Sequence, residues 1–138
     1  MSAFSPARRH AVAARADHRC EYCQLPNRGQ VATFPIDHVI PKSAGGSNEP
    51  DNLALTCPHC NSHKWTATHG DDPAAVGPAR LFHPRQDDWA EHFEWSADDP
   101  SELVGRTPTG RATIHALRIN ADDMLELRRL LARVGLLR

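Results

Sequence analysis

An α+β fold is predicted, in which a small ββα unit is pinned by one metal ion and flanked by an N-terminal helix and by a C-terminal β-hairpin with helices. Two observations carry this prediction. Four cysteines form two Cys-x2-Cys pairs, with two short apolar stretches between them. Outside the pairs, the sequence shows helix-capping signals and apolar side chains at helical spacing.

The N-terminal half gives each element of this unit in order. Ser5-Pro6 is typical of a helix N-cap and first helical residue, so a helix is expected over 7–17. After the first cysteine pair, an apolar stretch is expected as an edge strand, because it contains a proline. A loop rich in Pro, Gly, Ser and Asn, a second strand, the second cysteine pair and a short helix beginning at Asn61 follow. The two strands are expected over 31–36 and 53–56, and the loop over 41–51.

The cysteine spacing predicts a structural zinc site. Cys20, Cys23, Cys57 and Cys60 supply four thiolates, which close a tetrahedral Zn²⁺ and leave no open coordination position. A redox-active pair and buried free thiols are the alternatives, but neither pair lies in the βαβ pattern of thioredoxin-like motifs. Zinc would also supply folding energy that so small a unit cannot obtain from apolar burial.

Composition bounds the remaining possibilities. The chain has 138 residues, which is the size of one domain, and its net charge is −1. No apolar stretch is long enough for a transmembrane helix, and the N-terminus lacks the apolar core of a signal peptide, so a cytoplasmic protein is expected. The net charge is +2 over 1–64, −7 over 71–102 and +4 over 103–138. This balance argues against tight wrapping of DNA but leaves room for a small basic site.

The C-terminal half is expected to form a second structural unit. A linker-like stretch over 70–78 precedes an aromatic cluster, a hairpin with strands over 93–96 and 102–106, a helix capped at Thr107-Pro108, and a final helix beginning at Asn120. Apolar residues of that last helix share one face, which packs either on the core or in a dimer interface: Met124, Leu127, Leu131 and Val134.

Polar residues between and just after the cysteines are the candidates for chemistry. Asp37 and His38 end the first strand, Asn52 ends the loop, and Asn61 and His63 follow the last cysteine. If one ion closes both cysteine pairs, Asn61 returns close to Asp37. A carboxylate and an amide oxygen form a partial shell for a hard divalent cation, and a neighbouring imidazole is a suitable general base.

The stretch CEYC…DHVIPKSAGGSNEPDNLALTCPHCNSHK resembles the HNH endonuclease motif, the ββα-metal finger, in its zinc-knuckle form. The resemblance covers residues 20–64. A weaker resemblance of the C-terminal half to the extension of small stand-alone bacterial HNH proteins assigns no residues.

The resemblance implies a role for each candidate. His38 is implied as the general base that deprotonates the attacking water, and Asp37 and Asn61 as ligands of a catalytic Mg²⁺ or similar ion. Asn52 is implied as a support residue that fastens the loop and orients His38. His63 is a secondary candidate for the final histidine position. The implied activity is hydrolysis of DNA phosphodiester bonds.

The expected partner is double-stranded DNA, with Lys64 and Lys42 as phosphate contacts, although Lys64 could equally be a solvated helix lysine. Three segments are expected: an N-terminal helix (1–19), the zinc-knuckle nuclease core (20–70) and a C-terminal extension packed on it (71–138). The alternative function is a zinc-knuckle nucleic-acid-binding protein without cleavage activity. The biological substrate, a targeting partner and the choice between monomer and homodimer stay open.

Overall fold

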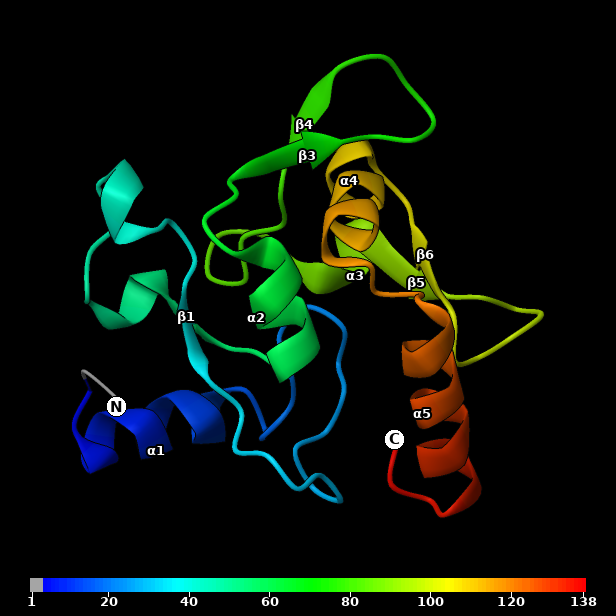
Figure 1. Cartoon of the computed structure of the whole chain (residues 1–138), viewed down its shortest axis with the longest axis horizontal. Coiled ribbons are helices and arrows are strands. Elements are labelled where there is room, and N and C mark those ends of the chain that lie inside the picture. Colours follow the sequence, from blue (N-terminus) through cyan, green and yellow to red (C-terminus); the bar gives the residue numbers. More distant parts are fainter. Residues whose placement is uncertain (1–3) are drawn as a thin grey trace.

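The computed structural model describes residues 4–138, and Figure 1 shows its helices and strands. The first three residues of the expected segment 1–19 lie outside the described residues. The elements run in this order: α1 (Pro6–Arg15), β1 (Ile36–His38), η1 (Lys42–Ala44), η2 (Pro50–Asn52), β2 (Leu53–Leu55), α2 (Pro58–Lys64), β3 (His69–Asp71), β4 (Pro78–Arg80), α3 (Trp89–His92), β5 (Phe93–Trp95), β6 (Leu103–Gly105), α4 (Pro108–Leu117) and α5 (Asp122–Arg133). The strands pair in sequence as antiparallel hairpins, β1 with β2, β3 with β4 and β5 with β6, which confirms the α+β class.

Helix α1 begins where its capping signal predicts. The Ser5 hydroxyl accepts a hydrogen bond from the Arg8 backbone N–H at 3.2 Å, and Pro6 is the first helical residue. Two arginines of this helix then reach across to the loop before β2 and to the first residue of β2. Arg8 donates to the Asn48 carbonyl at 2.7 Å, and Arg15 donates to the Leu53 carbonyl at 2.7 Å. The helix therefore holds the loop between the two strands of the ββα unit.

The β1–β2 hairpin carries the candidate residues, but its first strand lies later in the chain than predicted. The strand expected over 31–36 is wrong except at Ile36, and Val31 is fully exposed. The Asn27 side chain explains this difference. Its amide donates to the Ala32 carbonyl at 2.9 Å and its oxygen accepts from the Phe34 N–H at 3.2 Å, so a side chain uses the groups that a strand ladder would need.

Helix α2 begins at Pro58, three residues before the predicted start at Asn61. Cys57 is its N-cap, because its sulfur accepts from the Cys60 N–H at 3.4 Å. The second cysteine pair therefore spans the start of the helix, with Cys57 as its cap and Cys60 in its first turn. In Figure 1, α2 lies at the centre of the molecule, between β1 on one side and α4 on the other.

The C-terminal half follows the prediction in part. The hairpin of β5 and β6 and the Thr107 cap of α4 are confirmed, since the Thr107 hydroxyl accepts from the Gly110 N–H at 3.0 Å. The linker-like stretch over 70–78 is wrong, because β3 and β4 form a hairpin there. Helix α5 begins at Asp122 rather than Asn120. Its buried face includes Met124 and Leu131, whereas Val134 is 68% exposed and does not join the core.

One connected cluster of buried apolar side chains runs through both halves of the molecule. It includes Val12 of α1, the four cysteines, Phe82, and Leu137 near the C-terminus. Phe82, Phe93, Trp89 and Trp95 form consecutive ring contacts with centroid separations of 5.2 to 5.8 Å, as the aromatic cluster predicts. The expected boundary after residue 70 falls inside β3, and the division into three segments stays a prediction. No helix within residues 4–138 is long and apolar enough to cross a membrane.

Candidate functional site

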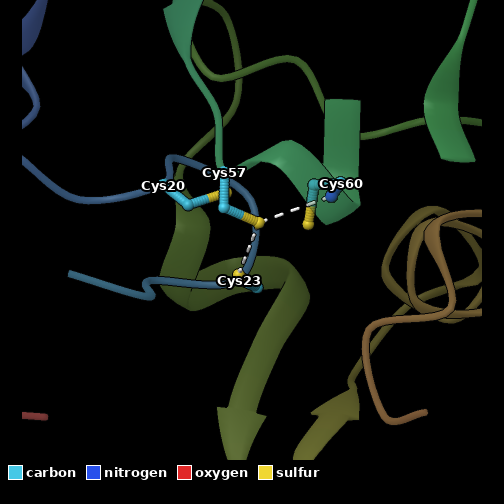
Figure 2. A group of neighbouring side chains, drawn as sticks. All are labelled: Cys20, Cys23, Cys57 and Cys60. Carbon is cyan, nitrogen blue, oxygen red and sulfur yellow. Dashed lines mark hydrogen bonds between the residues drawn. The ribbon is translucent and has the colours of Figure 1, made fainter. Parts of the chain in front are cut away.

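The four cysteine side chains converge on one point, as Figure 2 shows. Their sulfurs lie within 4.8 Å of one another, and Cys23 Sγ and Cys57 Sγ are 3.8 Å apart. Tetrahedral zinc with Zn–S bonds of about 2.3 Å places its sulfurs about 3.8 Å apart. All four residues are fully buried. The donor set and its spacing therefore fit a structural zinc, as the sequence predicts.

Backbone hydrogen bonds position both cysteine pairs. The Cys20 N–H donates to the Leu25 carbonyl at 2.8 Å, and the Gln24 N–H returns to the Cys20 carbonyl at 2.9 Å. Gln24 has a φ of 66°, so the chain turns sharply after Cys23. The second pair is fixed by the first turn of α2. Two local structures far apart in sequence thus present two sulfurs each to one centre.

The thiols of this cluster lie close enough to shift one another's pKa values. Hydrogen bonding with the Cys20 thiol lowers the pKa of Cys57 far below its ordinary range, and the other two thiols act in the same direction. Hydrogen bonds within the cluster, together with burial, raise the pKa of Cys23 and Cys60. Zinc binding needs these ligands as thiolates and would displace their protons.

Asp37 lies on the side of β1 that faces α2, in a buried polar cluster with Tyr22 and Lys64. The Tyr22 hydroxyl donates to Asp37 Oδ2 at 3.1 Å, and Lys64 Nζ lies 3.0 Å from the same oxygen. Lys64 is 1% exposed, and its ammonium also donates to the Val39 carbonyl at 3.0 Å and, at 3.3 Å, to that of His38. The ion pair therefore fastens α2 to β1.

This environment decides what Asp37 can bind. Burial raises the pKa of Asp37, and the Lys64 charge opposes that shift. Within residues 4–138, both hydrogen-bonding partners of the carboxylate use Oδ2, and Oδ1 has none. The half-buried side-chain amide of Asn61, one helical turn before Lys64, also has no hydrogen-bond partner there. A carboxylate oxygen and an amide oxygen are thus uncommitted on the two elements that Lys64 joins, which fits a hard divalent ion.

His38 is half-buried on the opposite side of β1 from Asp37. Its Nε2 lies 2.7 Å from Asn48 Oδ1, and the Phe4 ring packs against the imidazole at 5.5 Å between centroids. An amide oxygen only accepts, so this contact places the ring proton on Nε2. Nδ1 then carries the free lone pair that a general base needs.

Asn52 is buried and fastens the loop to the end of β1. Its Oδ1 accepts from the Ile40 N–H at 2.8 Å, and its Nδ2 donates to the carbonyls of Ile40 and Ser47, both at 2.9 Å. Gly46 is required beside this amide, because a Cβ there would lie 1.7 Å from the Ile40 carbonyl oxygen. Asn52 therefore bonds to backbone, and Asn48 contacts the His38 ring.

The other sequence candidates lie apart from this arrangement. His63 is exposed, and its Nδ1 bonds to the His59 carbonyl at 2.9 Å while the two rings stack at 4.2 Å. His59 is half-buried and bonds through Nε2 to the Arg118 carbonyl at 2.8 Å. Lys42 is exposed in η1. The interpretation of Lys64 as a solvated lysine is wrong, and its phosphate contact stays a prediction.

Sequence reasoning missed three residues of the site. Asn48 lies in the predicted loop, where one more polar residue carries no distinguishing signal. Tyr22, inside the first cysteine pair, is fully buried, and its hydroxyl needs a partner. Arg8 is one of the three arginines of α1. Its bond to the Asn48 carbonyl depends on how α1 packs, which no local pattern encodes.

Comparison with known proteins supports the interpretation of residues 20–66. Residues 20–66 match the family described as HNH endonuclease. The match contains both cysteine pairs, the β1–β2 hairpin and all of α2. No curated protein matches the chain. Together with the buried four-cysteine cluster, this match identifies residues 20–66 as an HNH endonuclease domain.

Proposed function

We propose that the protein is a metal-dependent DNA endonuclease that hydrolyses phosphodiester bonds with His38 as general base. One observation carries the proposal: Asp37 and His38 are adjacent on β1, and the Lys64 ion pair ties Asp37 to α2, the helix that also carries Asn61. A purely structural zinc knuckle has no need for an imidazole with one fixed nitrogen and one free nitrogen beside an uncommitted carboxylate oxygen.

Each residue then has a defined task. His38 takes the proton of the attacking water at Nδ1, because Asn48 keeps the other ring nitrogen protonated. Asp37 and Asn61 would hold a Mg²⁺-like ion through their free oxygens. Such an ion, when bound, supplies positive charge to the phosphate and to the leaving oxygen. Asn52 preserves the loop that carries Asn48.

Lys64 fits this scheme as a positioning residue. Its ammonium binds Asp37 Oδ2 and the His38 carbonyl, so one side chain fixes both β1 candidates relative to α2. A phosphate contact would require this buried ion pair to open. Exposed Lys42 keeps its proposed role as a phosphate contact, and cleavage of duplex DNA remains part of the proposal.

Nicking of supercoiled plasmid in Mg²⁺ or Mn²⁺ tests the assignment. Wild type should convert plasmid to nicked or linear forms, and His38→Ala should lose at least about 100-fold in rate, as expected for a general base. His115→Ala, which changes an exposed histidine of α4, is the matched control and should retain wild-type rate.

The same assay separates the alternatives. If His63→Ala loses activity and His38→Ala does not, His63 is the base and the proposed roles are reversed. If wild type binds DNA but cuts none across several divalent ions, the non-catalytic zinc-knuckle function replaces the nuclease.

A further inference from the structure

A hollow of about 150 Å³ lies next to the candidate residues and has no role in the chemistry described above. Val39 and Ile40, which directly follow His38, line it together with Lys64. Ala67 and Leu81 add apolar wall, and within the described residues no Asp or Glu side chain lines it. The chain has a net charge of −1, yet no acidic side chain in this lining would repel DNA beside the proposed cleavage site.

His83, a residue in the lining of this hollow, gives it an unused hydrogen-bond donor. The residue is 6% exposed, and its Nδ1 accepts from the Arg85 N–H at 3.2 Å. Burial lowers the pKa of His83, so the neutral ring is favoured. With Nδ1 accepting, the proton of the neutral ring is on Nε2, and no hydrogen-bond partner for Nε2 occurs within residues 4–138. This ring N–H is therefore open to an acceptor that a ligand supplies.

Size and lining select the class of ligand. A cavity of about 150 Å³ admits one benzene-sized ring, which is the size of a pyrimidine base. Apolar walls suit the faces of such a base, and the His83 N–H suits one of its carbonyl oxygens. A phosphate would be poorly accommodated here, because much of the lining is apolar and its two cationic side chains are already paired, Lys64 with Asp37 and Arg80 with Asp87.

We propose that this hollow binds one unstacked pyrimidine base of the DNA strand that lies across His38. The inference rests on the proposed nuclease function and narrows its substrate. A base enters such a hollow only where it has left the duplex stack, at a cost that is smallest in single strands, frayed ends and mismatches. The protein would therefore favour DNA with exposed bases near the cleaved phosphate.

Equilibrium binding without cleavage tests this proposal. Fluorescence anisotropy in Ca²⁺ would compare a short labelled thymidine oligonucleotide with an abasic oligonucleotide that carries the same number of phosphates. Wild type should bind the thymidine oligonucleotide about tenfold more tightly, which is a typical contribution of one bound base. Ala67→Leu, which fills the hollow, and His83→Phe, which removes the donor, should reduce this preference severalfold.

Controls keep the result interpretable. His115→Phe makes the same substitution on an exposed surface and should retain the preference, and zinc content together with melting temperature shows whether each variant is folded. Equal binding of the two oligonucleotides by wild type overturns the proposal, as does competition by inorganic phosphate with no dependence on the base. If Ala67→Leu or His83→Phe fails to fold, the wild-type comparison and the other variant still test whether the hollow binds a base.

The outcome is also separable from that of the plasmid assay. Base-dependent binding without any cleavage would refute the nuclease and keep the hollow as a base-binding site. Cleavage by a wild type that binds both oligonucleotides equally would keep the nuclease and remove the hollow from its mechanism.

Discussion

Replacement of Lys64 by methionine tests the buried ion pair that joins α2 to β1. Methionine keeps much of the length of the side chain but removes the ammonium, which has contacts of 3.0 to 3.3 Å with Asp37 and with two backbone carbonyls. Asp37 would then be a buried carboxylate without its counter-charge. Loss of one partner of a buried pair costs about 3–5 kcal/mol, a large part of the roughly 5–15 kcal/mol that stabilises a domain.

Urea unfolding followed by circular dichroism measures this cost. With a slope of about 2 kcal/mol per molar urea, the midpoint should fall by about 2 M relative to wild type. The deficit should also depend on pH. Burial raises the pKa of Asp37, and loss of Lys64 raises it further, so protonation relieves the unpaired charge. The stability lost at neutral pH should therefore be regained progressively as the pH falls through the raised pKa of Asp37 toward the lower pKa of the unfolded chain.

The double variant Asp37→Asn with Lys64→Met provides the control. It should be more stable than the sum of the two single changes predicts, because the uncompensated charge is gone. Mg²⁺ should stabilise Lys64→Met more than wild type if Asp37 Oδ1 binds the ion. A midpoint within about 0.3 M of wild type, with no change in pH dependence, would refute the role assigned to the ion pair.

Three further predictions concern the zinc centre, the base and one surface ion pair. Cys60→Ser should lose the single zinc per chain that elemental analysis is expected to find in wild type, and with it cooperative unfolding. Asn48→Ala should lower the nicking rate by about 10-fold or more, whereas Asn48→Asp, which keeps an acceptor oxygen for the His38 ring, should retain most of the activity; a wild-type rate for Asn48→Ala would contradict the assigned contact. The Arg129 hydrogen bond lowers the pKa of Asp99, so this pair adds stability above the unfolded pKa of about 3.9 and loses it as the pH falls through the folded value. Arg129→Met should remove that part of the acid dependence in thermal unfolding.

The sequence predicted the features that depend on residues close together in the chain. Cysteine spacing predicted the four-sulfur cluster, and the Ser5 and Thr107 caps placed the starts of two helices. It misplaced β1 because the Asn27 side chain binds the backbone of the apolar stretch, a contact with no periodic signature. It read residues 70–78 as a linker because Gly and Pro there mark a hairpin turn as readily as a loop.

For the candidate site, the residue types were predictable but their contacts were not. Asp37 and His38 were placed next to each other by sequence alone. That Lys64 is buried against Asp37, and that Asn48 rather than Asn52 contacts the His38 ring, depends on how α2 and the loop pack on β1. A helical lysine and a loop asparagine are ordinary surface residues in sequence, and only tertiary structure distinguishes them.

The arginines of α1 have a practical consequence for where an expressed fragment of this protein should begin. The family match begins at residue 20, after this helix, yet Arg8 and Arg15 hold the carbonyls of the loop that carries Asn48 and of β2. A fragment of residues 20–66 would keep all four cysteines but lose both of these restraints. We expect such a fragment to retain its metal and still be a poor enzyme, so the smallest useful unit begins upstream of the recognised motif.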